Sequence, residues 1–343
     1  MSVEPNGISG LVELGPKIEG LRGQRRKLAA LLPDGATLRE AFSRSVSGVW
    51  VGSAIVNREP APSASTFPGE VFICRLADGG ERPVLCKYGV SSCHDTEGHG
   101  GGPAYEALVY REILSRSELR RPEFLGCYEH PVSGETWLFL EYLADAVRLD
   151  ESSEPWESVA RATQWAARFH EEQAKRLDNP TPELRVYDEA YYLRWPRRVA
   201  GFASGDDLAW LRRVCEIFEG HVEAMTRSAQ TVIHGEFTVH NVLCTDSSIC
   251  PVDWESAAIA PGVIDLASMT EGWPAELAER CVSEYKSTLS PNETPSEFAS
   301  LLDVARVYWS LRWLGHKSDV IPSEKGQRRL QRLHEMVARL RWT

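Results

Sequence analysis

The chain has 343 residues, of which 43% are hydrophobic and 25% are charged; these are ordinary values for a globular protein and argue against disorder. Its net charge of −11 is opposite to the basic patch that nucleic-acid binding needs, so no nucleic-acid partner is expected. The eight cysteines include no CxxC pair, so a zinc site at the usual spacing is missing. Without a signal peptide or an apolar run of about 18 residues, we expect a cytoplasmic protein with no membrane partner.

The first part of the chain is predicted to be rich in strands. Residues 1–46 are expected to form an N-terminal extension with a helix near 21–32 that ends at Pro33-Asp34-Gly35. From about 50 to 143, short runs of β-branched and aromatic residues alternate with turn residues, and ADGG predicts a hairpin between the second and third strands. A glycine-rich connector leads into a helix near 104–116, and another hairpin follows.

The second part is predicted to be mainly helical. Apolar residues recur at helical spacing near 154–173, 206–225, 297–316 and 324–341. Residues 231–255 are predicted to form two short apolar strands joined by the turn TDSS. Strands first and helices later indicate an α+β protein with two lobes, and they argue against an alternating βαβ chain.

The predicted hairpin gathers oxygen-bearing side chains. If its strands pair antiparallel, Asp253 returns close to Asn241, and Glu236 lies five residues before Asn241. Such oxygens suit Mg²⁺, which proteins usually hold with few side chains together with substrate phosphates. An acid, an Asn five residues later and an Asp twelve residues after that form the pattern of a kinase catalytic loop. The hairpin therefore predicts phosphoryl transfer.

Two motifs, HGEFTVHNVL and PVDWESAAIAPGVIDLA, resemble the aminoglycoside phosphotransferase family and its relatives, the choline and small-molecule kinases. The resemblance runs from about residue 50 to the C-terminal helices, and the motif here has His-Gly-Glu in the catalytic loop. It implies a protein-kinase-like fold with a small β-rich N-lobe and a larger helical C-lobe. By this resemblance Glu236 matches the catalytic Asp, and Asn241 and Asp253 match the magnesium ligands.

The same resemblance assigns supporting residues. Asp265 matches an Asp that steadies the catalytic loop, His234 is expected to stabilise that loop through hydrogen bonds, and Glu255 continues the family's Asp-Trp-Glu motif. In relatives the substrate lies near the aromatic run at 187–195. The substrate candidates are therefore Tyr187, Asp188, Glu189, Trp195 and Glu255, although core packing is an alternative for the aromatic residues.

The N-lobe candidates follow from kinase architecture. Such a lobe needs a Lys on its third strand paired with an acid on the next helix. Lys87 meets the first requirement, and the resemblance favours Glu106 over its rival Glu112 for the second. The sequence FLEYL resembles the hinge that bonds the nucleotide base, which makes Glu141 and Leu143 candidate cofactor-binding residues. In the loop before the second strand, Ser63, Ser65 and Thr66 are candidate phosphate contacts, with a plain surface loop at least as good an interpretation.

These observations predict a kinase that uses ATP or GTP and Mg²⁺ to phosphorylate a hydroxyl of a small molecule. The predicted domains are the extension (1–46), the nucleotide-binding lobe with its hinge (47–143) and the helical lobe with the catalytic hairpin and substrate site (144–343). Glu236 is one methylene, about 1.5 Å, longer than the Asp of the pattern. An alternative is therefore a catalytically impaired pseudokinase that binds nucleotide and acts through protein partners.

Overall fold

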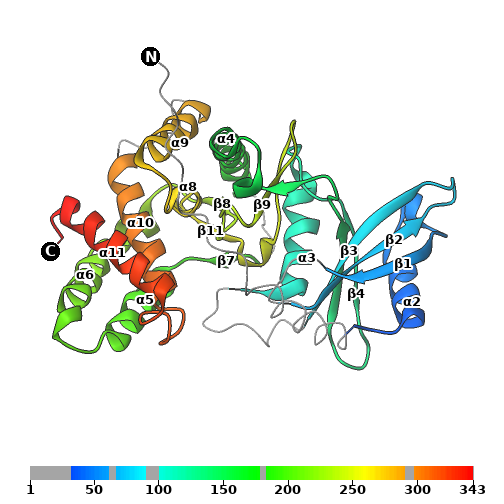
Figure 1. Cartoon of the computed structure of the whole chain (residues 1–343), viewed down its shortest axis with the longest axis horizontal. Coiled ribbons are helices and arrows are strands. Elements are labelled where there is room, and N and C mark those ends of the chain that lie inside the picture. Colours follow the sequence, from blue (N-terminus) through cyan, green and yellow to red (C-terminus); the bar gives the residue numbers. More distant parts are fainter. Residues whose placement is uncertain (1–31, 62–66, 90–99, 178–182, 290–296, 343) are drawn as a thin grey trace, which may run out of the picture.

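The computed structural model describes residues 32–61, 67–89, 100–177, 183–289 and 297–342. A strand-rich N-lobe occupies one end of the molecule and a helical C-lobe the other (Figure 1). The order of the two lobes agrees with the prediction from sequence. The helix predicted near 21–32, except for Leu32, and the three hydroxyl residues at 63, 65 and 66 lie outside the described residues.

The N-lobe is built on a five-stranded antiparallel sheet with the strand order β1-β2-β3-β5-β4. Its strands are β1 (Ala54–Pro60), β2 (Gly69–Arg75), β3 (Glu81–Gly89), β4 (Phe124–Glu129) and β5 (Thr136–Glu141). Both predicted hairpins, β2–β3 and β4–β5, are present.

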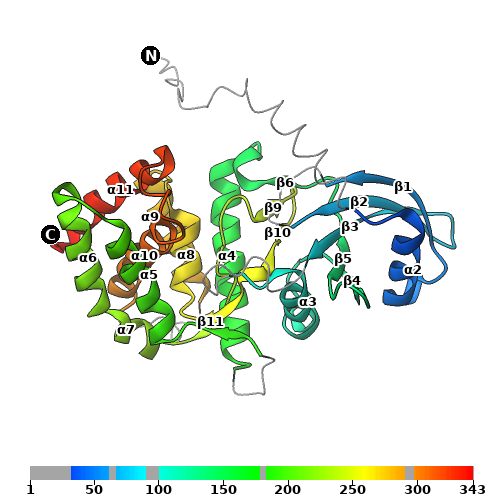
Figure 2. The same ribbon diagram turned by 90° about the horizontal axis from the view of Figure 1, so that it is seen from below.

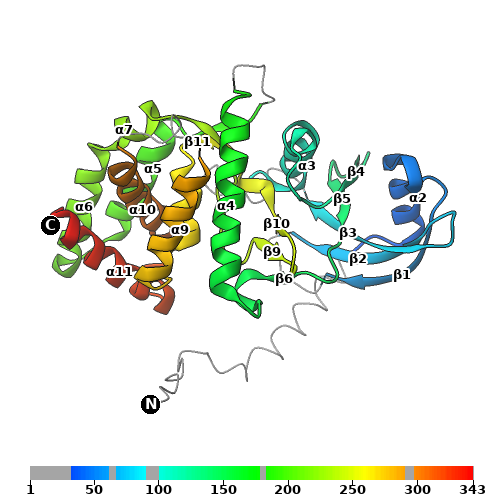
Figure 3. The same ribbon diagram turned by 90° about the horizontal axis from the view of Figure 1, so that it is seen from above.

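The two faces of this sheet are covered by different helices. Along β5, Trp137 and Phe139 pack in a cluster with α2 (Gly35–Ser45), whereas Leu138 and Leu140 pack in the larger core that includes α3 (Gly102–Glu112). This alternation is the period-2 pattern of a strand buried on both faces. Figures 2 and 3 show α2 at the far end of the N-lobe.

Helix α2 was not predicted from the sequence. The helix expected to end at Pro33-Asp34-Gly35 lies almost wholly outside the described residues, and Asp34 begins α2: its carboxylate accepts hydrogen bonds from the backbone N–H of Ala36 (2.8 Å) and Thr37 (3.0 Å). Leu38 and Phe42 of this helix are buried against the sheet. Part of the predicted extension thus packs in the N-lobe.

The C-lobe contains most of the helices. They are α4 (Pro155–Ala174), α5 (Glu189–Phe202), α6 (Ala209–Glu219), α7 (Val222–Arg227), α8 (Val263–Thr270), α9 (Ala275–Thr288), α10 (Phe298–Leu314) and α11 (Glu324–Leu340). The helix predicted over 206–225 is interrupted at Gly220, where α6 ends. Helices α5, α8 and α9 were not predicted.

Short strands position the loops of the C-lobe. One sheet has the order β10-β9-β6 and the other the order β7-β11-β8. The strands are β6 (Val147–Arg148), β7 (Arg185–Val186), β8 (Thr231–Ile233), β9 (Val242–Cys244), β10 (Ile249–Pro251) and β11 (Ala258–Ala260). Strands β9 and β10 form the predicted antiparallel hairpin. Single 3₁₀ turns lie at Gly48–Trp50, Leu114–Arg116, Leu149–Glu151, Asp206–Leu208 and Trp254–Ser256.

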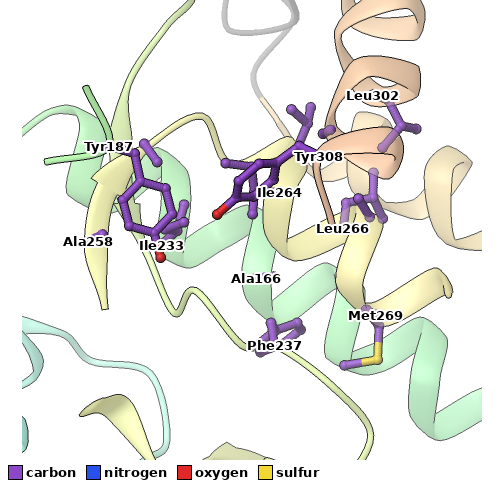
Figure 4. Packing of buried hydrophobic residues seen from close by; sticks show 14 of the residues in the cluster. Ala166, Tyr187, Ile233, Phe237, Ala258, Ile264, Leu266, Met269, Leu302 and Tyr308 are labelled. Carbon is purple, nitrogen blue, oxygen red and sulfur yellow. The ribbon is translucent and has the colours of Figure 1, made fainter. Parts of the chain in front are cut away.

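The segment between β8 and β9 is anchored by apolar residues on both sides of a polar loop. Ile233 and Phe237 are buried with Ile264, Leu266 and Met269 of α8 (Figure 4). The intervening residues 234–236 therefore have little freedom to move. In the described part of the chain, no helix combines the length and the apolar character needed to cross a bilayer.

Candidate functional site

The polar loop after β8 is held by Asp265, on the first turn of α8. Its carboxylate accepts hydrogen bonds from the backbone N–H of His234 (2.7 Å) and Gly235 (3.0 Å). Gly235 has a φ of 81°, and a Cβ there would lie 2.1 Å from the carbonyl oxygen of Ser256. The loop thus requires the Asp265 carboxylate, which accepts from its backbone N–H groups, and a glycine at position 235.

Asp265 is itself fixed by a buried network. His170 Nε2 lies 3.0 Å from Asp265 Oδ2, and His170 Nδ1 lies 2.6 Å from the hydroxyl of Tyr285. If Nε2 carries the proton and donates to Asp265, Nδ1 accepts from Tyr285, and all three side chains are satisfied. The network connects α4, α8 and α9, so three helices determine where the loop lies.

His234 joins the loop to the hairpin. Its Nε2 donates to the carbonyl oxygen of Val252 (2.8 Å), and its Nδ1 accepts from the backbone N–H of Glu236 (3.3 Å). The side chain is 1% exposed. Both ring nitrogens have backbone partners, an arrangement that suits loop stabilisation better than proton exchange with a substrate.

The hairpin brings Asn241 and Asp253 together, as its antiparallel pairing predicts. The backbone N–H of Val252 donates to the carbonyl oxygen of Asn241 (2.8 Å), and Asn241 Nδ2 donates to that of Glu236 (3.1 Å). This assignment leaves Asn241 Oδ1 as the acceptor atom of the amide. Asp253 has left-handed backbone angles (φ 66°, ψ 56°), which are uncommon for a residue other than glycine and occur often at functional sites.

Lys87 connects the two lobes at this point. Its ammonium lies 2.8 and 3.0 Å from the carboxylate oxygens of Glu106 and 2.7 Å from Asp253 Oδ1. Burial acts to lower the pKa of Lys87, but the charges of Asp253 and Glu106 outweigh it and raise the pKa above its usual value. Glu106 also accepts from the backbone N–H of Trp254 (3.2 Å).

The rival acid lies elsewhere. Glu112, in the last turn of α3, pairs with Arg111 (2.9 Å) and Arg116 (3.5 Å) and is partly exposed. The structure therefore brings Glu106, and not Glu112, to Lys87.

Glu255 lies near the carboxylates of Asp253 and Glu106. Burial, together with the carboxylates of Asp253 and Glu106, raises the pKa of Glu255 to about 8. Its carbonyl oxygen accepts from the backbone N–H of Gly101 (2.9 Å). A Cβ on Gly100 would lie 3.6 Å from Glu255 Cδ, so the carboxyl group packs against the glycine-rich connector.

The side chain of Glu236 has a partner that the sequence analysis missed. Arg312, near the end of α10, forms an ion pair with Glu236 through Nη2 and Oε1. The Arg312 side chain is only 5% exposed, and its guanidinium lies over the rings of Trp309 (4.9 Å) and Trp313 (5.1 Å). The available signal was a single arginine in the otherwise uncharged run VYWSLRWLG, where a buried charge implies a counter-charge.

The predicted hinge residues lie on the segment that leaves β5. The backbone N–H of Glu141 donates to the carbonyl oxygen of Glu123 (2.9 Å), and its carboxylate pairs with Arg120 (2.7 Å). The carbonyl oxygen of Leu143 accepts from Ala146 (3.3 Å). Contact of Glu141 and Leu143 with a nucleotide stays a prediction.

The aromatic substrate candidates require correction. Trp195 is fully buried and Tyr187 is 1% exposed, with its ring stacked 3.8 Å from that of Tyr191. Both belong to the C-lobe core, so neither side chain presents a surface to a substrate. Asp188 caps α5 by accepting from the backbone N–H of Tyr191 (2.7 Å), and Glu189 is exposed in the first turn of that helix.

Comparisons with known proteins agree with this geometry. The model of the phosphotransferase enzyme family matches residues 106–299. A search of curated proteins finds no match. The fold is similar to that of a microcompartment-associated aminopropanol kinase (TM-score 0.61, 14% identity, 89% of this chain and 96% of that one covered).

Two further solved structures share the fold. One is the choline kinase LicA from Streptococcus pneumoniae (TM-score 0.55, 11% identity, 93% and 99% covered). The other is a thermostable mutant of an aminoglycoside phosphotransferase in a ternary complex with ADP and hygromycin B (TM-score 0.60, 14% identity, 83% and 94% covered). At these identities the likeness shows the fold, and the predicted two-lobed kinase-like α+β class is confirmed.

Proposed function

The chain belongs to the phosphotransferase enzyme family, and from this premise we propose that it transfers the γ-phosphate of ATP or GTP to a hydroxyl of an aminoglycoside, amino sugar, sugar or amino alcohol. The enzyme class expected from the sequence, a kinase with an alcohol group as acceptor, is confirmed by the family match. Nothing in the comparisons supports the pseudokinase alternative.

The observation that carries the proposal is the position of the Lys87 ammonium between Glu106 and Asp253. It joins the third strand of the N-lobe to the hairpin of the C-lobe, so a cation and a carboxylate meet where the lobes meet. We assign to Lys87, positioned by Glu106, the α- and β-phosphates of the nucleotide. Glu141 and Leu143 are assigned to the base, with residues 47–143 as the nucleotide-binding part of the chain.

The chemistry of the donor atoms near Lys87 fits Mg²⁺. Asp253 supplies carboxylate oxygens and Asn241 supplies Oδ1, and these are hard ligands. The described residues contain no cluster of three or more His, Cys, Asp or Glu that could hold a metal, so substrate phosphates would have to complete the coordination. When bound, Mg²⁺ would neutralise charge on those phosphates.

The proposed step uses Glu236 to orient the acceptor and to take its proton. An electron pair of the acceptor oxygen forms a bond to the γ-phosphorus while the bond from that phosphorus to the β–γ bridging oxygen breaks. The electrons of the broken bond leave with the nucleoside diphosphate, and the acceptor's proton passes to the Glu236 carboxylate. Because the Glu236 side chain is 22% exposed, it is open to a hydroxyl.

A transfer screen tests the proposal. Labelled ATP and GTP are supplied with Mg²⁺ to panels of aminoglycosides, amino sugars, amino alcohols and simple sugars, and labelled products are separated. Asp253→Ala should abolish transfer. Asp246→Asn, a matched change of an exposed acid in the turn of the same hairpin, should leave transfer intact. If nucleotide raises the melting temperature but no small molecule is labelled, the proposal fails and the pseudokinase alternative is favoured.

A further inference from the structure

The ion pair between Arg312 and Glu236 solves a positioning problem in the catalytic loop. We propose that Arg312 is the positioning residue for the Glu236 carboxylate, and that this pair allows a Glu to stand where the kinase pattern has an Asp. The inference rests on the proposed role of Glu236 in orienting the acceptor.

A Glu at this position needs external support. Compared with Asp it has one more rotatable bond and reaches about 1.5 Å further. The loop's hydrogen bonds to Asp265 fix the backbone of His234 and Gly235, but they do not fix the end of the Glu236 side chain. A misplacement near 1 Å at a reacting centre can lower the rate by about 100-fold.

Arg312 meets this need because it is immobile. Its guanidinium lies over two indole rings, and Trp309 is held in turn by donating from Nε1 to Glu271 (2.8 Å). Burial acts to lower the pKa of Arg312, but the charge of Glu236 outweighs it and raises the pKa above its usual value. The ion pair therefore stays charged on the arginine side, and α10 gives it a rigid base.

Two helices thus hold different parts of the loop. Helix α8 holds its backbone through Asp265, and through Ser268, whose hydroxyl donates to the carbonyl oxygen of Phe237 (2.9 Å). Helix α10 holds the Glu236 side chain through Arg312. A shorter Asp would withdraw the carboxylate from Arg312, so the length of Glu236 and the placement of Arg312 belong together.

The chain offers a control for Arg312 on the same helix. Arg306 also lies on α10, but it pairs with Asp303 (3.1 Å). Arg306→Met removes a guanidinium and its ion pair from α10 while Glu236, Arg312 and Glu271 keep their side chains. It should leave kcat unchanged.

The test is a double-mutant cycle on kcat, measured as phosphate transfer to an acceptor from the panel, or as phosphate release from ATP with water as acceptor. Arg312→Met should lower kcat by about 100-fold without changing KM for ATP. Arg312→Lys should recover part of the loss, because it keeps the charge but not the planar stacking. Glu236→Asp should lower kcat, although it restores the residue of the kinase pattern.

The second background separates positioning from general destabilisation. In the Glu236→Gln background, Arg312→Met should lower kcat no further. It should raise the melting temperature there, because it removes a buried charge that has lost its Glu236 counter-charge. If Arg312→Met leaves kcat unchanged, or lowers it equally in both backgrounds, the inference is overturned while the proposed function stands. If Glu236→Gln keeps full kcat, the inference and the proton-accepting role proposed for Glu236 are overturned, while the proposed transfer stands.

Discussion

Lys87 and Asp253 are 166 residues apart in the sequence, yet the Lys87 ammonium lies 2.7 Å from Asp253 Oδ1. This contact joins β3 of the N-lobe to Asp253, the second residue after β10 in the C-lobe. Lys87 is almost fully buried there, and Glu106 is 1% exposed on its other side. The N-lobe residues that we propose to hold the nucleotide phosphates and the hairpin of the C-lobe are therefore electrostatically coupled.

Replacing Lys87 with Met should both inactivate and destabilise the protein. The change leaves Glu106 buried without its counter-charge, and loss of one partner from a buried pair costs about 3 kcal/mol or more in the free energy of unfolding. Urea unfolding measures this loss, and the transfer assay measures activity. Lys87→Met/Glu106→Gln should regain stability but not activity. A double variant as unstable as Lys87→Met would contradict the role of charge burial.

Gly235→Ala should disrupt the proposed catalytic loop. The new Cβ would lie 2.1 Å from the carbonyl oxygen of Ser256, and the residue would keep a positive φ. Gly79→Ala is the matched control, because Gly79 has a φ of 87° and nothing within 4 Å of its Cβ position. Gly79→Ala should lower the free energy of unfolding only by its backbone strain, about 1 kcal/mol. Equal losses of stability and activity in the two variants would show that the contact with Ser256 is unimportant.

Asp265→Asn should lower stability and kcat together. The carboxylate accepts from two backbone N–H groups and lies within hydrogen-bond distance of His170 Nε2, and hydrogen bonds to a charged group contribute about 2 kcal/mol each. Tyr285→Phe removes only the hydroxyl at the outer end of this network, so it should lower the free energy of unfolding by only about 1 kcal/mol. Urea unfolding of both variants provides the comparison, and a larger loss in Tyr285→Phe would refute the proposed order.

The cap of α2 should weaken in acid. Hydrogen bonds from the Thr37 hydroxyl and from the backbone N–H of Thr37 and Ala36 lower the pKa of Asp34 from 3.8 to about 2. A lowered pKa in the folded state means that the ionised cap stabilises fully above pH 3.8 and loses this effect as the pH falls toward 2. Asp34→Asn keeps an uncharged acceptor.

The stability difference between wild type and Asp34→Asn isolates this effect. It should be constant near neutral pH and shrink as the pH falls below about 4. Thermal unfolding at a series of pH values measures it. A difference that stays constant through this range would exclude the ionised cap as its source.

The sequence by itself determined the parts of the site that are local. Glu236, Asn241 and Asp253 lie within one hairpin, and the antiparallel pairing of β9 and β10 follows from two short apolar strands and a turn. The fold class followed from the order of strands and helices. Lys87 could be placed because β3 is a clear strand between turn residues.

The tertiary structure decided whatever depends on residues distant in the chain. Sequence left Glu106 and Glu112 as rivals, and packing of α3 against β3 and the 3₁₀ turn at Trp254 buried Glu106 beside Lys87. The spacing of aromatic residues could not distinguish a substrate-binding surface from a packed core, because both need large apolar rings. In the structure, Tyr187 and Trp195 are buried.

Arg312 is the clearest case, since it lies 76 residues from Glu236. The spacing of residues along the sequence indicates only which of them share a helix face or a strand. Which buried cation meets which acid is determined by how α10 packs against the loop.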